Sequence, residues 1–575
     1  MSDRAMAPPT DIRVDRRAFL ERMTALTATA TLAPGVFAGT GAGRARAAFA
    51  RAVPVRLPRG DEPQATEIAG LTLVEAARLM GAGDLSSAEL VDACLERIGR
   101  WDDDYMAFNT VLADEARAAA RQADAAGADP AHPLRGVPLA VKDNFYTAGV
   151  PTTANSHLFA DFVPAFDATA WARLRDAGAI LLGKTQMGPL ATTAATTPDG
   201  ERTTVNAWSP FDAEVSPGGS SSGSATAVAA RMAPCSTGTQ TGGSITIPSG
   251  NQGLTGLKPT MGRVSLQGIL PLTYTRDHPG PIARDARDAA VMLQVMAGPD
   301  PADPRSLGLP PVADYVAATE APRRGGIFWP TRVGVWPGYL DDPTPPGEEP
   351  DEQDRDRQQD RSDASLRAER RRAVYERNRA EVAARRAMLE TLEGLGADIV
   401  EIDAPRDWET LTGWAFNNAR LPERSEIFLE HLRRDVRGFG VSLSPWINGL
   451  LLPAAEYIRG QRAKLLLLRS ILDDVFSACD VVVQTQPFPF DMVGLPLISF
   501  PIGFESASTV GPRPLAGVLG GLPYGEDRLL AVAAAYQRAT DWHRRRPGDP
   551  SSFERTAPGG DAGRIDASDV MELSQ

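Results

Sequence analysis

The stretch "GTQTGGSITIPSGN", from Gly238 to Asn251, sets two adjacent glycines in front of a serine. Gly242 and Gly243 have no side chain, so consecutive backbone N–H groups here can turn towards one point, a nest suited to an oxyanion. Ser244 ends the nest and is a candidate nucleophile, while the simpler interpretation is a turn between sheet and helix. The stretch holds no histidine, so a nucleophilic Ser244 would need a base from elsewhere.

A second Gly/Ser-rich stretch, "SPGGSSSGSATAVAARM", begins at Ser216. Gly218 and Gly219 allow unusual backbone angles, and the serines that follow precede an alanine-rich helical pattern, where hydroxyls are favoured as caps. The segment also matches G-x-S-x-G around Ser221. Because Pro217 makes the preceding residues a poor strand, we interpret that match as chance.

A third stretch, "GVPLAVKDNF", places Lys142 at the end of an apolar run that reads as a buried strand. Burial disfavours the charged ammonium and would lower the pKa of Lys142. The alternative is a solvated lysine paired with Asp143.

Short apolar runs alternate with helical patterns along the chain, which predicts an α/β core around a mostly buried sheet. Residues 66–128 read as helical, with Ser86, Ser87 and Glu89 as a start signal. The later runs "TRVGVW", "ADIVEI", "DVVVQTQ" and "LPLISFPIGF" read as strands. Residues 338–365 are Pro-rich and then densely charged, which predicts a mobile insert. A long helical pattern follows and can stop at Gly394 or Gly396, and residues 548–575 read as a flexible tail.

The composition excludes several classes of protein. The 575 residues carry a net charge of -13, which argues against nucleic-acid binding. Three widely spaced cysteines and five histidines show neither a disulfide framework nor metal-ligand spacing, so we expect no metal and no cofactor.

Residues 1–50 have the layout of a twin-arginine export signal. Arg16 and Arg17 precede a weakly apolar Ala/Thr/Gly-rich region, and small-residue cleavage sites follow after Ala47 or Ala50. The alternative is a membrane anchor, which Thr, Gly and Pro34 disfavour. We therefore expect an exported protein, periplasmic or extracellular, with no stable membrane insertion after cleavage.

Taken in order, the blocks of this chain resemble the amidase signature family. They include "RGVPLAVKDNF", "DAGAILLGKTQM", "PGGSSSGSATAVAARMAP", "GTQTGGSITIP", "GLTGLKPTMGRVSLQGILPL" and "RDHPGPIARDARDAAVML". The resemblance runs from Glu67 to Pro547. It implies a catalytic domain over residues 66–547 with a large mixed central β-sheet covered by α-helices on both faces.

The resemblance also implies roles for individual residues. Ser244 matches the family's nucleophile, Ser220 a bridging serine that follows a cis peptide bond, and Lys142 the base. The backbone N–H groups of Thr241, Gly242, Gly243 and Ser244 match an oxyanion hole.

Some positions depart from the family pattern. Thr246 stands where many members carry arginine, which weakens the expectation of a substrate that is the monoamide of a dicarboxylic acid. Gln186 stands where asparagine is usual, and Asn251 lies in an unusual "PSGNQG" stretch. We expect Gln186 and Asn251 to contact the substrate.

The implied function is hydrolysis of a small-molecule carboxylic amide by a monomer or homodimer, through an acyl-enzyme on Ser244. One alternative keeps this triad and cleaves esters or aryl acylamides. Another is the glutaminase subunit of a transamidosome, which works with partner proteins on charged tRNA. The expected export signal and the acidic balance argue against that last alternative.

Overall fold

The computed structural model describes residues 55, 57–58, 65–129, 131–320, 326–327, 329–346, 361–439, 441–505 and 512–553, with the side chains of residues 361–367 and of Trp414 omitted. All of these belong to one unit, residues 52–575. The expected export signal therefore lies outside the described residues, as do half of the expected insert and most of the tail.

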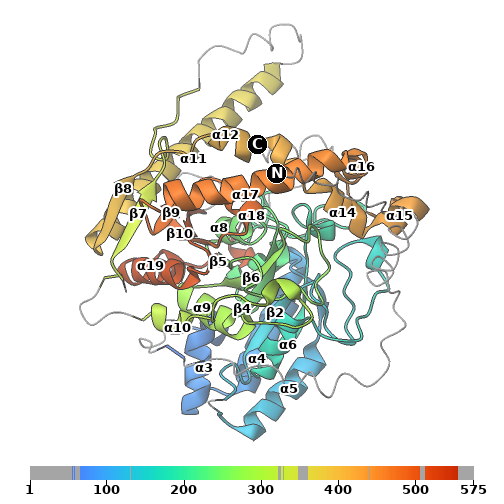
Figure 1. The fold of residues 1–575 in the computed structure, drawn as a ribbon. Helices are drawn as coiled ribbons and strands as arrows, with labels where there is room; N and C mark the ends of the chain where they lie inside the picture. The colour runs from blue at the N-terminus through green and yellow to red at the C-terminus, as the bar shows by residue number, and fades with distance from the viewer. Residues whose placement is uncertain are drawn as a thin grey trace, which may run out of the picture. The chain divides into compact units, whose positions relative to one another are not determined.

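One sheet of 11 strands organises the described residues (Figure 1). The strand order is β1-β3-β2-β4-β6-β5-β10-β11-β9-β7-β8. Strand β2 pairs in parallel with β3 and β4, and β7 pairs in parallel with β8 and β9, while the other pairs are antiparallel. The expected mixed α/β sheet is confirmed. The strands are β1 (Phe108–Val111), β2 (Pro138–Lys142), β3 (Ile180–Thr185), β4 (Cys235–Gln240), β5 (Thr255–Lys258), β6 (His278–Ala283), β7 (Thr331–Val335), β8 (Ala397–Glu401), β9 (Val481–Val483), β10 (Leu497–Glu505) and β11 (Arg513–Gly521).

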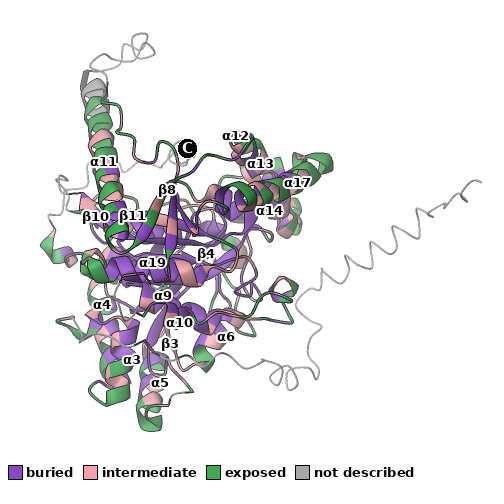
Figure 2. Ribbon diagram, turned by 60° about the vertical axis from the view of Figure 1, so that its left-hand side comes forward, coloured by how far each residue is buried: buried purple, intermediate pink, exposed green. Residues whose placement is uncertain are grey.

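Helices cover both faces of the sheet. The α-helices are α3 (Leu73–Ala82), α4 (Ser87–Tyr105), α5 (Ala113–Ala126), α6 (Thr169–Asp176), α7 (Ser222–Ala229), α8 (Thr246–Asn251), α9 (Ala286–Met296), α10 (Tyr315–Ala318), α11 (Arg361–Gly394), α12 (Trp408–Thr412), α13 (Trp414–Asn418), α14 (Leu421–Ile427), α15 (Leu429–Arg434), α16 (Ser444–Leu451), α17 (Ala454–Ser470), α18 (Phe488–Val493) and α19 (Glu526–Ala539). Figure 2 shows the strands and α9 mostly buried, while α11 and α17 carry exposed residues along their length.

Side chains that alternate along the strands feed two cores. Leu139 and Val141 of β2 pack with α6, α9 and α19, whereas Ala140 packs with α4 and α7. Since successive side chains of a strand point to opposite faces, Lys142 shares the face of Ala140 and is directed towards α7.

The structure refines three expected boundaries. Residues 66–128 are helical except for β1, and a capping box between Ser86 and Glu89 starts α4 as expected. The insert is shorter than 338–365, because Tyr339 is buried in the core and residues from Arg361 onward belong to α11, which ends at Gly394. The loose tail does not begin at 548, because Asp549 pairs with Arg97 at 2.6 Å.

The start of α7 is where the fold positions the Gly/Ser-rich stretch. A Cβ atom on Gly223 would lie 2.3 Å from the carbonyl oxygen of Ala107 and 2.7 Å from the backbone nitrogen of Gln186. Only glycine lets α7 approach the loop ends of β1 and β3 this closely.

We therefore expect Gly223→Ala to destabilise the protein by about 1–3 kcal/mol, because the added methyl overpacks a buried contact. Thermal unfolding followed by circular dichroism would measure the loss. The matched control is Gly99→Ala in α4, where no heavy atom lies near the new Cβ and where we expect a gain of up to about 1 kcal/mol. Equal melting temperatures for Gly223→Ala and wild type would contradict this account of the packing.

Candidate active site

Lys142, at the carboxyl end of β2, is completely buried among hydroxyl groups. Its Nζ lies within hydrogen-bond distance of three hydroxyls, Ser220 Oγ at 2.8 Å, Ser221 Oγ at 2.9 Å and Thr239 Oγ1 at 2.8 Å. Gly238 helps to make room for this cluster, because a Cβ there would lie 3.2 Å from Ser221 Oγ.

Burial holds the pKa of Lys142 well below its ordinary value, and the carboxylate of Asp277 opposes that shift only in part. The neighbouring Asp143 faces away from Lys142. Its Oδ1 pairs with Lys184 Nζ at 3.2 Å, and its Oδ2 accepts hydrogen bonds from Thr153. The alternative of a solvated Lys142 paired with Asp143 is thereby excluded.

Ser220 follows a cis peptide bond between Gly219 and Ser220. Two close backbone contacts require the preceding glycines. A Cβ on Gly219 would lie 2.4 Å from the carbonyl oxygen of Thr193, and Gly218 has a φ of +77° with its backbone against Pro248. These contacts place Ser220 at the end of the lysine side chain.

Ser244 sits at the turn between β4 and α8 and keeps 9% of its surface exposed. We call residues 241–245, between β4 and α8, the nucleophile loop. The carbonyl oxygen of Ser244 accepts a hydrogen bond of 2.5 Å from Ser221 Oγ, which connects this loop to Lys142 and its hydroxyl partners. Among the described residues, no hydrogen bond joins the hydroxyls of Ser244 and Ser220. The structure thus brings Lys142 and Ser220 into contact and holds Ser244 beside them through Ser221.

The four backbone amides expected to face an oxyanion do not all point the same way. The N–H of Gly243 donates to Asp491 Oδ2 at 2.9 Å, so the expectation is wrong for Gly243 in this conformation. Within the described part of the chain, the N–H groups of Thr241, Gly242 and Ser244 have no hydrogen-bond acceptor. These three amides are the ones available to a substrate oxygen.

Gln240 and Asp491 brace the loop that carries Ser244. Gln240 Oε1 accepts the backbone N–H groups of Ile245 and Thr246, and Gln240 Nε2 donates to Asp491 Oδ1 at 2.9 Å. Lys258 Nζ lies 3.8 Å from the same carboxylate oxygen. Sequence reasoning missed this bracing, because Asp491 lies 251 positions from Gln240 and carries no local motif.

Three further side chains near the triad were also missed. Thr239 and Ser221 bind Lys142 directly, and Asp277 accepts a hydrogen bond of 2.5 Å from Thr241 Oγ1. The position of Ser221 next to Ser220 was the available signal, although the G-x-S-x-G match around it gave the wrong chemistry.

The side chains of Gln186 and Asn251 bond elsewhere. Gln186 Oε1 accepts from Asn155 Nδ2 at 2.5 Å and from Thr203 Oγ1 at 3.1 Å. Asn251 Nδ2 donates to the Ser216 carbonyl at 3.3 Å. Neither side chain is hydrogen-bonded to Lys142, Ser220 or Ser244. Their hydrogen bonds join neighbouring loops instead.

No three metal-binding side chains gather into a site within the described ranges. In the same part of the chain, no helix combines the length and the apolar character needed to cross a membrane.

Known proteins match this chain over most of its length. A model of the amidase family matches residues 89–350. A glutamyl-tRNA(Gln) amidotransferase subunit from Roseiflexus castenholzii is 34% identical over 529 residues, covering 84% of this chain and 98% of the relative. The corresponding protein of Azotobacter vinelandii is 34% identical over 526 residues, covering 83% and 99%.

Among solved structures, the peptide amidase of Stenotrophomonas maltophilia superposes with a TM-score of 0.66 at 26% identity, covering 85% of this chain and 99% of that enzyme. The glutamyl-tRNA(Gln) amidotransferase subunit of Thermotoga maritima shares the fold, with a TM-score of 0.62 at 22% identity and coverage of 86% and 99%. The extent of the matches to curated relatives shows that this chain belongs to the amidase family.

Proposed function

We propose that the protein hydrolyses a carboxylic amide to an acid and an amine or ammonia through an acyl-enzyme on Ser244. Membership of the amidase family indicates an enzyme that cleaves amide C–N bonds. The observation that carries the finer proposal is the buried Lys142 amine, whose hydrogen-bond partners include Ser220 while the neighbouring carboxylate is paired with Lys184.

The proposed relay moves one proton at each step. Ser244 Oγ attacks the amide carbon and gives its proton to Ser220, which passes its own proton to the neutral amine of Lys142. The oxyanion is met by the free N–H groups of Thr241, Gly242 and Ser244. The protonated Lys142 then returns a proton through Ser220 to the leaving nitrogen.

The hydrogen bond between Ser244 and Ser220 that this relay needs would form with bound substrate, since catalytic contacts are often longer in free enzymes. Water takes the place of the amine in the second half-reaction and cleaves the acyl-enzyme by the same relay. The same groups would cleave an ester or an aryl acylamide, and rates on matched ester and amide substrates separate these chemistries.

A second candidate follows from the names of the relatives. Several relatives are subunits of an amidotransferase, so the chain would release ammonia from an amide for a partner protein. Hydrolysis of a free amide by the purified chain alone favours the first candidate. Activity that appears only with a tRNA-handling partner favours the second.

Replacing the proposed nucleophile gives the first test. Ser244→Ala should lower kcat on any accepted amide by about 10⁴-fold or more, because no acyl-enzyme can form. Mass spectrometry should detect an acyl adduct on Ser244 in wild type alone. The control is Ser249→Ala, a buried serine of α8 whose hydroxyl has no hydrogen-bond partner. Near-normal turnover by folded Ser244→Ala would refute the assignment.

The lowered pKa of Lys142 predicts the pH profile. The neutral amine is the active form, so kcat should rise with pH through a pKa below the ordinary lysine value of about 10.4 and then level off. Lys142→Met should lose this dependence along with most of the activity. A rise of kcat centred near pH 10.4 would show that the active lysine is solvated.

We also propose that residues 1–50 direct export, with Arg16 and Arg17 as the recognition pair. The Arg16→Lys, Arg17→Lys double variant should stay uncleaved in the cytoplasm of a host with the twin-arginine pathway, whereas wild type reaches the periplasm or the medium. Cell fractionation and N-terminal sequencing measure both. Arg13→Lys is the control, and equal export of all three proteins would contradict the proposal.

A further inference from the structure

Four cationic side chains from distant parts of the chain lie within one another's electrostatic reach. Arg276 precedes β6, Arg420 caps the start of α14, Arg424 lies in its last turn, and Lys464 lies on α17. Burial lowers the pKa values of Arg420, Arg424 and Lys464, and the positive charge of Arg276 lowers them further. Among the described residues, none of the four forms an ion pair.

Several of the guanidinium N–H groups are buried without an acceptor. Arg276 is 2% exposed, and its Nε and Nη2 have no hydrogen-bond partner. Arg424 is 7% exposed, its Nε also lacks a partner, and its guanidinium lies 5.7 Å from the centre of the Trp446 ring. A buried, unsatisfied charged donor is costly, so these groups are expected to have a partner in the working enzyme.

One asparagine orients two of the arginines. Arg276 Nη1 donates to Asn417 Oδ1 at 2.8 Å, and Arg420 Nη1 donates to the Asn417 carbonyl at 2.6 Å. Asn417 is itself buried at the end of α13. The arrangement fixes guanidinium groups and leaves some of their N–H groups free, as expected of a preformed anion site.

The nearby carboxylates are engaged by other groups. Glu423 accepts hydrogen bonds from Thr275, Tyr457 and Gln461. Asp277 accepts from Thr241 Oγ1 and from two backbone N–H groups. Burial lowers the pKa of Arg276 and of Arg424 to about 10 even with these acids in the vicinity. Asp491, Glu423 and Asp277 oppose this shift at Arg276, and Asp277 opposes it at Arg424, but among the described residues none of these carboxylates forms an ion pair with either arginine.

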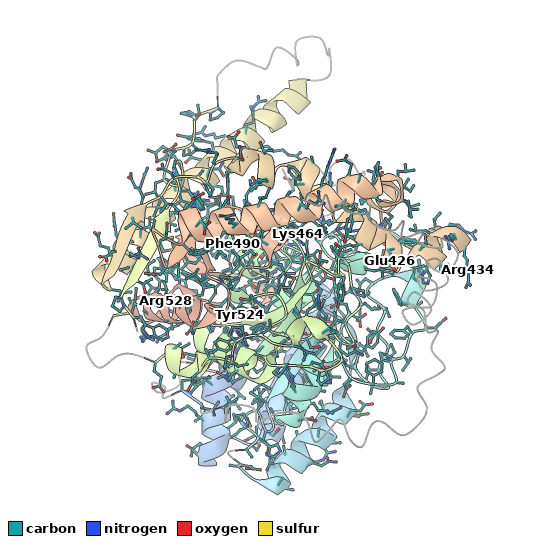
Figure 3. All side chains as sticks on the ribbon, in the orientation of Figure 1. Glu426, Arg434, Lys464, Phe490, Tyr524 and Arg528 are labelled. Atoms are coloured by element: carbon teal, nitrogen blue, oxygen red, sulfur yellow. The ribbon has the colours of Figure 1, made fainter. Side chains whose placement is uncertain are left out.

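The cluster is tied to the reacting centre through Asp277. This residue is adjacent to Arg276 in the chain and bonds to Thr241 of the nucleophile loop. Its charge acts on the pKa of Lys142 and on that of Arg424, so both side chains lie within its field. Figure 3 places Lys464 near the middle of the molecule, over the sheet, while Arg434 lies at the periphery.

We propose that Arg276 and Arg424 bind a carboxylate carried by the amide substrate, which makes the preferred substrate an anionic amide. This inference rests on the proposed hydrolysis at Ser244. The planar guanidinium matches a carboxylate through paired N–H donors, and the Trp446 ring backs Arg424. An anionic substrate would satisfy the N–H groups that the protein leaves open.

The test compares two charged amides with neutral isosteres in which an isopropyl group replaces the carboxylate. Succinamate and 4-methylpentanamide place the difference on the acyl side, and N-butanoylglycine and N-isobutylbutanamide place it on the amine side. Wild type should prefer the charged member of one pair by at least about 30-fold in kcat/KM, the lower range for a buried charge pair. The preferred pair identifies the side of the scissile bond that faces the arginines.

Arg276→Met and Arg424→Met should each reduce that charged-to-neutral ratio by at least about 30-fold. Arg434→Met, an exposed control on the neighbouring α15, should keep the wild-type ratio. Thermal melting checks that each variant folds, and the wild-type comparison stands even where a variant does not.

Equal rates on charged and neutral members of both pairs in wild type would overturn the carboxylate site while leaving amide hydrolysis intact. A wild-type ratio that both folded arginine variants retain would overturn it as well. Failure to hydrolyse any amide, neutral or charged, would instead refute the proposed function.

Discussion

The proposed chemistry depends on the environment of one amine, that of Lys142. Lys142 ends a buried strand, and two features keep a positive charge there unfavourable. Burial removes water from Lys142 Nζ. The carboxylate of Asp143, the next residue in the chain, forms an ion pair with Lys184 and so does not stabilise a charged Lys142. The remaining partners are neutral hydroxyls and a carbonyl, which can exchange protons with an amine or hydrogen-bond to it without fixing a charge. The second lysine is therefore as much a part of the site as the first, because it balances Asp143.

The nucleophile loop is likewise shaped by residues outside it. Its two glycines allow several backbone conformations, and side chains from other segments determine which backbone N–H groups stay without a partner. Asp491 takes the N–H of Gly243 and, with Gln240, ties down the amides of Ile245 and Thr246. What remains open is a smaller donor set around Ser244. A glycine-rich sequence can adopt many turns, so this selection by a side chain from α18 supplies the precision that the loop itself lacks.

Sequence patterns predicted the strands that are apolar, such as Val481–Val483 and Leu497–Glu505, and the cap at Ser86. They missed β4, whose "CSTGTQ" residues are small or polar although all are buried, and β6, which contains two prolines. Both strands flank the active site, where function selects residues that hydrophobic periodicity cannot detect. The triad positions came from resemblance to a family. Asp491 and the arginines lie too far along the chain for spacing to reveal them.

Thr246, where many family members carry arginine, and the buried arginines Arg276 and Arg424 bear on the same question, the charge of the substrate. Thr246 bonds to Gln240 and contributes no charge, which by itself weakened the expectation of a dicarboxylic acid monoamide as substrate. Arg276, which precedes β6, is oriented by Asn417, and its neighbour Asp277 bonds to Thr241 of the nucleophile loop. Arg424 of α14 shares the electrostatic field of Asp277. Neither arginine is a hydrogen-bond partner of Lys142, so the charge at Arg276 or Arg424 can change without removing a member of the proton relay. Selection for a different acyl or amine group would then act on α13 and α14, while Lys142 and its hydroxyl partners keep the chemistry constant.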